Sequence, residues 1–349
     1  MSVESLPPAS PQPETKSTHS LSTTRAPLPA LYLAPMAGVT NTIFRQICLD
    51  HGADVLTSEF VSAEGILHRN SRTQEYLDFD ERERPVGVQL FGANPEALAE
   101  AARHVIDWVR PDFIDLNFGC PVNKVVSKHG GSALLRDCLL LDRVARAVVR
   151  AADPLPVTAK IRIGWNAETI NATTTSAILE QAGIQRVAVH GRTKDQAYSG
   201  EADWNVIAEV ADTVDIPVIG NGDIASGADA RKRARETQVS GLMIGRAAMA
   251  NPWIFQEIKA ELSGETYEAP SDDARWGLMI DHCRREVVRR GDERRAMHSL
   301  RARLMAYSRA LPHAKALRTQ FAKLESVGQL EDLAATAIAG RIAPAAPVS

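Results

Sequence analysis

Cys120 is the first candidate for chemistry in this sequence. It belongs to the sequence NFGCP, in which Pro121 stops a strand or helix from continuing directly, so we expect the thiol in a loop. A thiol there can be a nucleophile, a metal ligand or a proton donor. No second Cys or His lies at metal-ligand spacing, which argues against a metal. With an ordinary pKa of about 8.5, the thiol is mostly protonated at neutral pH and can serve as a general acid.

Four further polar residues stand within or at the end of apolar runs. Lys160 lies inside TAKIRIG, where burying a lysine costs several kcal/mol unless it meets an anion. It can face a carbonyl or a developing negative charge, or it can pair with a glutamate at the rim of the fold. Gln89 and Asn117 end neighbouring runs and offer the donors and acceptors that recognition of a planar polar ring requires. His190 begins HGRT at a corresponding position and is a further site candidate.

Two glycine-containing sequences predict a phosphate site. Asn221, Gly222 and Asp223 follow one apolar run, and Gly245 and Arg246 follow the next. Backbone amides can approach an anion closely at glycine, and the arginine adds positive charge. The alternative is that the glycines only form tight turns. The paired occurrence favours a phosphate site without naming the ligand.

The elements that must position these residues recur regularly. Short β-rich runs alternate with helical patterns such as 95–109 and 173–183, which predicts βαβ units and a parallel sheet. Eight runs within about 230 residues favour a (β/α)8 TIM barrel, whose strand carboxyl ends form the active face. A doubly wound sheet is the alternative, but the sequence has no early GxGxxG motif. The eight runs are LYLAPMAG (31–38), VLTSEF (55–60), VGVQLFG (86–92), FIDLNFGC (113–120), VTAKIRIG (157–164), RVAVHGRT (186–193), VIGNGDI (218–224) and GLMIGRA (241–247).

The pattern changes after residue 264. No strand pattern follows, and helical patterns over 272–290, 293–310, 312–325 and 329–339 predict a smaller all-helical C-terminal domain. The Pro-, Ser- and Thr-rich start predicts a disordered tail. We therefore divide the chain into a disordered tail (1–27), a barrel (28–264), a helical domain (271–340) and a frayed tail (341–349).

Composition excludes some protein classes. The 349 residues contain no apolar run of about 18 residues, so a membrane span is not expected. The four cysteines are too widely spread for a disulfide scaffold or a CxxC zinc site, which suggests the reducing cytoplasm. Apart from Cys120, they fall in helical patterns and are expected to be inert: Cys48, Cys138 and Cys283.

The net charge of −3 argues against a nucleic-acid partner until its distribution is considered. Residues 275–323 hold 13 Lys and Arg against 4 Asp and Glu, about +9, which leaves about −12 for the rest of the chain. Such a charge run is either a solvated helix face or an RNA-binding surface, and alone it leaves both open. The arginine pairs that concentrate the charge are Arg284 and Arg285, Arg289 and Arg290, and Arg294 and Arg295.

Ten ordered motifs resemble the tRNA-dihydrouridine synthases, and most closely the general bacterial branch of that family. The resemblance runs from about residue 31 to about residue 335, and the segment from NFGCP to GSALL is nearly diagnostic. The motifs are APMAGVTNTIFR (34–45), SEF (58–60), QLFG (89–92), DLNFGCPVNKV (115–125), GSALL (131–135), KIRIGW (160–165), HGRT (190–193), GEADW (200–204), NGDI (221–224) and MIGRAAMANPWIF (243–255).

The resemblance implies a barrel that binds FMN, with Cys120 as the proton donor and Asn117 beside flavin and uracil. Lys160 and Gln89 would bond the isoalloxazine edge, and His190 falls in a motif of the flavin pocket. The residues implied to pack against the flavin are Pro35, Met36 and Ala37, and those implied to hold the ribityl chain and phosphate are Asn221, Gly222, Asp223, Gly245 and Arg246.

The reaction implied is reduction of the C5–C6 double bond of uridines in tRNA, by an oxidoreductase that uses NADPH. Reduced flavin would supply hydride to C6 and Cys120 a proton to C5. The helical domain would bind tRNA through its arginines, with the target base flipped out of the RNA. We expect a cytoplasmic monomer. A dehydrogenase for a free pyrimidine is one alternative, but it leaves the basic domain unexplained. A non-catalytic RNA-binding module is another, and the intact Cys120 and Lys160 argue against it.

Overall fold

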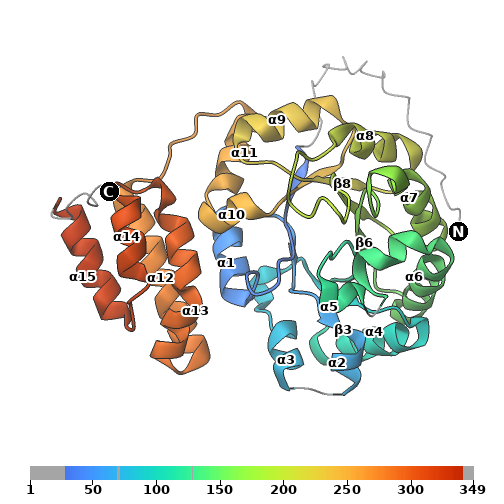
Figure 1. Ribbon diagram of the computed structural model, residues 1–349, viewed down its shortest axis with the longest axis horizontal. Helices are drawn as coiled ribbons and strands as arrows, with labels where there is room; N and C mark the ends of the chain where they lie inside the picture. The colour runs from blue at the N-terminus through green and yellow to red at the C-terminus, as the bar shows by residue number, and fades with distance from the viewer. Residues whose placement is uncertain (1–27, 69–70, 128, 341–349) are drawn as a thin grey trace, which may run out of the picture.

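The computed structural model describes residues 28–68, 71–127 and 129–340. The predicted tails at 1–27 and 341–349 lie outside these residues. Within the described chain, a parallel barrel surrounded by helices is followed by a helical region (Figure 1). This confirms the predicted TIM barrel with an all-helical C-terminal region.

The strands follow the order expected for a closed parallel barrel. The neighbours run β1, β9, β8, β7, β6, β5, β4, β2, and all the pairs are parallel. A parallel bridge between Tyr32 and Val55 closes the ring from β1 to the start of β2. The strands are β1 (Ala30–Leu33), β2 (Leu56–Thr57), β3 (Val61–Ser62), β4 (Val86–Phe91), β5 (Phe113–Phe118), β6 (Val157–Arg162), β7 (Val187–His190), β8 (Val218–Asn221) and β9 (Gly241–Ile244).

The second barrel strand is broken in two, unlike the single run predicted over 55–60. Both β2 and β3 pair with β4, but Leu56 pairs with Val86 whereas Val61 pairs with Leu90, so one extra residue lies between them. Such a bulge re-aims the side chains it contains. Here Glu59 lies in the break between the two strands. Its carboxylate accepts a hydrogen bond of 2.6 Å from the amide of Gly38 in the loop after β1.

Helices cover the outside of the barrel (Figure 1). Their ends follow ordinary capping chemistry: Asn94 caps α4 and Pro95 occupies its first turn, and the helix has the bounds predicted for 95–109. The barrel helices are α1 (Thr42–Asp50), α2 (Ala63–Leu67), α3 (Ser71–Leu77), α4 (Pro95–Val109), α5 (Asn123–Val126), α6 (Cys138–Ala152), α7 (Ala172–Gln181), α8 (Trp204–Thr213), α9 (Gly227–Glu236), α10 (Arg246–Ala250) and α11 (Ile254–Ser263), with 3₁₀ helices at Glu81–Glu83, Gly131–Arg136 and Ala167–Thr169.

The helical region comprises α12 (Asp272–Arg290), α13 (Glu293–Tyr307), α14 (Ala314–Phe321) and α15 (Val327–Ile338), with a 3₁₀ turn at Ser308–Ala310. Ser271 caps α12, and Gly291 ends it in the left-handed conformation, which confirms the helix predicted over 272–290. The helix predicted over 312–325 is shorter than expected: it begins at Ala314, after His313 with its positive φ, and it ends at Phe321.

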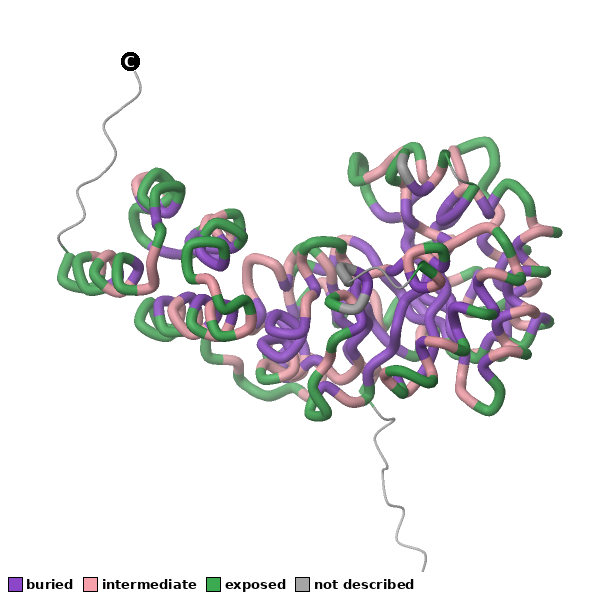
Figure 2. The backbone as a smooth tube through the Cα atoms, turned by 90° about the horizontal axis from the view of Figure 1, so that it is seen from below, coloured by how far each residue is buried: buried purple, intermediate pink, exposed green. Residues whose placement is uncertain are grey.

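Two separate clusters of apolar side chains stabilise the fold. A small one inside the barrel contains Tyr32, Ala188, Ile219 and Met243. The large one fills the space between sheet and helices and continues into the helical region through Trp276. Figure 2 shows the buried segments running through the barrel and along the inner sides of these helices. The helical region therefore shares a core with the barrel, with α12 packed on α1 and α13 on α10.

Candidate active site

The strand register brings the predicted site residues of five neighbouring strands together. Asn117 of β5 lies opposite Lys160 of β6, and His190 of β7 lies opposite Asn221 of β8. Gln89 of β4 lies opposite Asp115, two residues before Asn117. Residues paired in a parallel sheet share one face, and Lys160 is also paired with Ala188 of the inner cluster. The five side chains therefore line the inside of the barrel toward its carboxyl end.

A chain of buried hydrogen bonds joins Gln89 to the Cys120 loop. The Gln89 Nε2 donates to Asp115 (2.6 Å), and the Asn117 Nδ2 donates to the Gln89 Oε1 (2.8 Å). The Asn117 Oδ1 accepts from the amides of Gly119 (3.0 Å) and Cys120 (2.9 Å). Asp115 thereby sets the orientation of both amide side chains, because the donor of Gln89 must face its carboxylate.

Cys120 is held in a narrow turn, and the residue is only 7% exposed. Its carbonyl oxygen accepts hydrogen bonds from the amide and the hydroxyl of Ser132 (3.1 and 2.9 Å). Gly131 has a φ of +59°, and a Cβ there would lie 2.8 Å from the Cys120 carbonyl oxygen. Burial raises the pKa of the thiol, against the lowering effect of a backbone hydrogen bond from Val122 and of the nearby cations. The thiol is therefore protonated at neutral pH.

Lys160 is partly buried beside the side-chain amide of Asn221. Its Nζ donates to the Asn221 Oδ1 (3.1 Å), and the Asn221 Nδ2 donates to the carbonyl of Met243 (2.7 Å), which fixes the orientation of the asparagine. Burial, assisted by the charge of Arg162, lowers the pKa of Lys160 to about 8, and Asp115 opposes this shift. The ammonium group is thus charged at neutral pH but loses its proton readily in mild alkali.

His190 is an uncharged histidine at the same level. Burial, followed by the nearby charges of Lys160 and Arg162, lowers its pKa to about 2. The imidazole therefore binds by hydrogen bonding rather than by charge. Beside it, Gly222 has a φ of +130°, and a Cβ there would lie 3.3 Å from the His190 ring and 2.6 Å from the Cβ of Ala202. Glycine is required at this position.

The loops after β8 and β9 form a cationic corner. Asp223 binds Arg192 through both oxygens (2.9 and 2.8 Å) and also binds Arg246 (3.0 Å). Burial alone would raise the pKa of Asp223, but the hydrogen bond and charge of Arg192 bring it below its usual range. None of the described residues accepts a hydrogen bond from the amides of Gly222, Gly245 or Arg246.

The loop after β1 lies across this corner. Thr40 fixes the turn of this loop. Its hydroxyl accepts a hydrogen bond from the amide of Met36 (3.0 Å), and its own amide donates one to the Met36 carbonyl. Met36 is partly buried, and its sulfur would lie 3.8 Å from a Cβ on Gly245. Pro35 is partly buried and Ala37 exposed. The predicted flavin-contacting residues are therefore next to the predicted phosphate loops.

The predicted RNA-binding arginines have unequal exposure. Arg294 and Arg295 are the freest, with side chains 78% and 83% exposed. Arg284 is mostly exposed and pairs with Glu331, whereas Arg285 and Arg290 are about one-third exposed. Arg289 is only 15% exposed and pairs with Glu286 and Glu75.

Three site residues were not predicted from the sequence. Asp115 is hidden in an apolar run, and only its presence two residues before Asn117 signals an inward position. Arg162, two residues after Lys160, donates to the carbonyls of Gly119, Thr193 and Ala197 and so ties the Cys120 loop to the loop after β7. Arg192, inside HGRT, is fully engaged with Asp223 and the carbonyls of Ser199 and Gly200.

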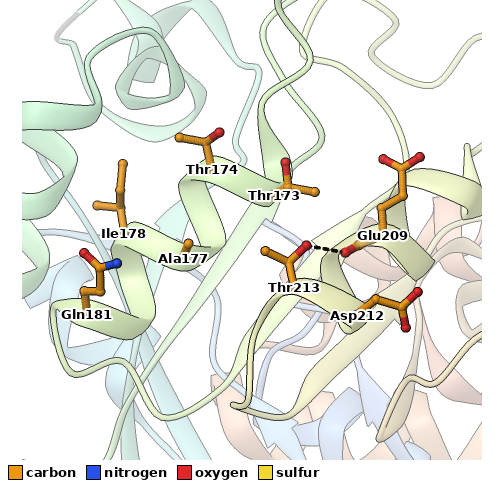
Figure 3. Close-up of a pocket in the computed structure, with 8 residues that line it drawn as sticks. All are labelled: Thr173, Thr174, Ala177, Ile178, Gln181, Glu209, Asp212 and Thr213. Carbon is orange, nitrogen blue, oxygen red and sulfur yellow. Dashed lines mark hydrogen bonds between the residues drawn. The ribbon is translucent and has the colours of Figure 1, made fainter.

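Two hollows lie away from the barrel mouth. A groove of about 730 Å³ runs on the outer surface between α7 and α8, lined by threonines and by Glu209 and Asp212 (Figure 3). A smaller one of about 310 Å³ lies between α1 and α12, next to Trp253.

Within the described residues, no group of three or more His, Cys, Asp or Glu side chains could hold a metal ion. No described helix is both long and apolar enough to cross a membrane.

The fold and this cluster define a (β/α)8-barrel protein with a candidate active site at the carboxyl ends of its strands, the usual place in such barrels. Residues 32–342 match the family model described as dihydrouridine synthase (Dus). The chain belongs to the dihydrouridine synthase family, which confirms the resemblance seen in the sequence.

Individual relatives support this assignment. The chain is 42% identical to the tRNA-dihydrouridine synthase B of Pseudomonas aeruginosa over 296 residues, which cover 84% of this chain and 88% of that protein. It is 34% identical to the probable tRNA-dihydrouridine synthase of Aquifex aeolicus over 303 residues, 85% and 92% of the two chains. Among solved structures, the BexX/CysO complex of Amycolatopsis orientalis gives a TM-score of 0.44 with 18% identity, over 71% of this chain and 97% of that chain, and is too distant to support an argument.

Proposed function

We propose that the protein reduces the C5–C6 double bond of specific uridines in tRNA to 5,6-dihydrouridine, as an FMN- and NADPH-dependent oxidoreductase. Membership of the family supports the substrate and the reaction. The observation that carries the proposal is the nearly buried Cys120, whose backbone is held by Ser132 and Gly131 at the mouth of the barrel that Lys160 lines. When bound and reduced by NADPH, FMN is the hydride donor for C6 of the uracil ring.

The residues present fit FMN. The unbonded amides of Gly222, Gly245 and Arg246, together with the half-exposed Arg246 side chain, are donors suited to its phosphate. Because Gly222 has no side chain, its backbone can lie beside His190. A Cβ at this position would collide with Ala202. Asp223 acts through Arg246, whose guanidinium it orients. Lys160 would face the isoalloxazine edge, as would Gln89, which has one N–H left to donate. Pro35, Met36 and Ala37 would pack against the ring, and Asn221 would adjoin the ribityl chain.

The chain supplies the proton and fixes its position. Cys120 donates its thiol proton to C5, and its raised pKa keeps that proton available at neutral pH. Asn117 holds the Cys120 backbone through its Oδ1, and it would lie beside the uracil ring. Lys160 stabilises negative charge that develops on the reacting rings, in a partly buried setting where electrostatic interactions are strong.

The helical region binds the RNA in this proposal. Folded RNA is held mainly through phosphates and shape, which suits the exposed Arg284, Arg294 and Arg295 and the partly exposed Arg285 and Arg290. We assign catalysis to residues 28–264 and RNA binding to residues 271–340. The target base must leave the RNA core to reach Cys120, so base flipping is expected. We place the reaction in the cytoplasm, with the protein as a monomer.

The test is Cys120→Ala, assayed with unmodified tRNA and with free uracil. We expect dihydrouridine in tRNA to form about 10²–10⁴-fold more slowly, because a general acid is lost. Flavin content and NADPH oxidation should stay within about twofold, and free uracil should not be reduced by either protein. Cys138→Ala is the matched control, since Cys138 begins α6 outside the site. Wild-type dihydrouridine formation in Cys120→Ala would overturn the assignment.

A further inference from the structure

The basic character of the helical region is only partly available to RNA. Arg303 of α13 is 8% exposed: its guanidinium lies 4.1 Å from the ring centroid of Phe44 in α1, and it donates to the carbonyl of Met249 in α10 (3.2 Å). Arg289 of α12 is similarly turned toward the barrel. These two arginines contact barrel residues at the interface where the barrel and the helical region meet, so their charges do not face the solvent.

Glu286 is the centre of the polar part of this interface. It is 1% exposed, and its carboxylate accepts hydrogen bonds from Arg289 (2.8 and 3.1 Å) and from Arg290. It also accepts a hydrogen bond from the Nδ2 of Asn41 in the barrel (3.1 Å). Arg289 extends the contact to Glu75 of α3 (3.1 Å). A buried carboxylate with four donors around it is stable only while all of them remain in place.

The barrel side of this contact is rigid. The Asn41 Oδ1 caps α1 by accepting from the amide of Phe44 (3.0 Å), which leaves only its Nδ2 to face Glu286. The adjoining carbonyl of Thr40 accepts from Arg45 (2.8 Å), and Arg45 is itself buried in an ion pair with Glu83. The loop after β1 is therefore held without α12, so α12 is the element whose position the contact decides.

We propose that Glu286 is a positioning residue, which locks α12 onto Asn41 and thereby fixes the orientation of the RNA-binding helices relative to the barrel mouth. This inference rests on the proposed function. Van der Waals packing of α12 on α1 tolerates small rotations, whereas a hydrogen-bonded carboxylate with fixed donors does not. A small rotation of α12 would shift bound RNA at the mouth, because the exposed arginines lie on α12 and at the start of α13. Misplacement of the RNA would raise its KM.

The experiment exchanges donor and acceptor across the contact. Asn41→Asp keeps the helix cap but places a second carboxylate against Glu286, and we expect the KM for tRNA to rise about tenfold. Adding Glu286→Gln restores a donor–acceptor pair, so the double variant should return to within about threefold of wild type. NADPH oxidation and flavin content should stay within about twofold throughout. Glu331→Gln, which removes only the exposed partner of Arg284, is the matched control and should leave the KM unchanged.

A merely structural role predicts a different result. Removal of independent stabilising contacts gives additive effects, so a double variant with a KM higher than either single variant would overturn the inference. An unchanged KM in Asn41→Asp would also overturn it. Hydrogen exchange over residues 283–290 gives a readout independent of catalysis and should be faster in Asn41→Asp and restored in the double variant. If the wild-type protein forms no dihydrouridine, the proposed function fails, and unchanged exchange then refutes the lock itself.

Discussion

The barrel mouth and the helical region both concentrate positive charge, but they hold it in opposite ways. At the mouth, Arg162 and Arg192 are 3% and 2% exposed, and their donors bind backbone carbonyls or a carboxylate. In the helical region, Arg294 and Arg295 extend into solvent with one carboxylate partner each. The mouth thus has fixed charges before any ligand arrives, whereas the outer arginines can adjust to an irregular polyanion.

The difference has an energetic consequence. A fixed charge in a site that excludes water interacts strongly and needs little reorganisation during a reaction. An exposed ion pair contributes at most about 1 kcal/mol and is screened by salt. Changes at the mouth should therefore reduce the rate of the chemical step by large factors. Changes at the outer arginines should alter affinity by small factors that depend on ionic strength.

Among the charged residues of the two regions, Lys160 should have the largest effect on replacement. In Lys160→Met the chain keeps the apolar part of the side chain but loses the charge near developing negative charge, so we expect dihydrouridine formation to fall about 10²–10³-fold. The wild-type rate should also decline above pH 8, about tenfold by pH 9, because the pKa of Lys160 is lowered to about 8 and its charged form is lost as the pH rises. Steady-state rates between pH 6 and 10 test both.

The variant itself supplies one control for this pH dependence, since Lys160→Met should lack the decline near pH 8. Lys194→Met is the matched substitution, because Lys194 lies over Trp165 and pairs with Asp195 without contacting the inner strand residues. A rate within twofold of wild type in Lys160→Met would show that the charge of Lys160 at the mouth is unimportant, contrary to the expected difference between the mouth and the helical region.

Gly131→Ala should have the next largest effect. The added Cβ would lie 2.8 Å from the Cys120 carbonyl oxygen at a φ of +59°, so the thiol must shift. We expect kcat to fall about 10–100-fold because a displacement of this kind misplaces a reacting group. The free energy of unfolding should also fall by about 1–3 kcal/mol. Single-turnover rates and denaturant titrations measure the two effects.

Gly277→Ala is the control that makes the same Gly→Ala change away from Cys120. Gly277 lies within α12, and a Cβ there meets no atom within 4 Å. Alanine should therefore stabilise the helix by about 0.5–1 kcal/mol without altering kcat. If Gly131→Ala behaves like Gly277→Ala, the turn does not position Cys120.

Periodic features of the fold were predictable from the sequence. The eight strands and α12 were found because apolar alternation, capping residues and terminal glycines act over short stretches of chain. The break between β2 and β3 was not predicted, because a bulge depends on the register with the partner strand, and the sequence VLTSEF does not show where that register shifts. Likewise, the later start of the third helix of the helical region, after the positive φ of His313, was not predicted.

Site residues that touch the mouth directly were found by their type, since Lys160 and Gln89 are unexpected inside apolar strands. Residues that act through others were missed. Asp115 resembles an ordinary polar interruption until its partner Gln89 is known, and their contact spans 26 residues of sequence. The charge count failed in a similar way: Arg289 and Arg303 contribute to the basic total, yet only the three-dimensional packing shows that both face the barrel.

Charge reversal of the outer arginines should have the smallest effect, and its signature is salt dependence. In Arg294→Glu/Arg295→Glu, two of the most exposed cations are replaced by anions, so we expect the KM for tRNA to rise about tenfold at low salt, with kcat and flavin content unchanged. The slope of log KM against log salt should fall by about one to two, because fewer counterions are released on binding. Arg146→Glu, on α6 of the barrel, is the control and should leave the slope unchanged. A loss of kcat with an unchanged salt slope would place these arginines with the fixed charges of the mouth, contrary to their exposure.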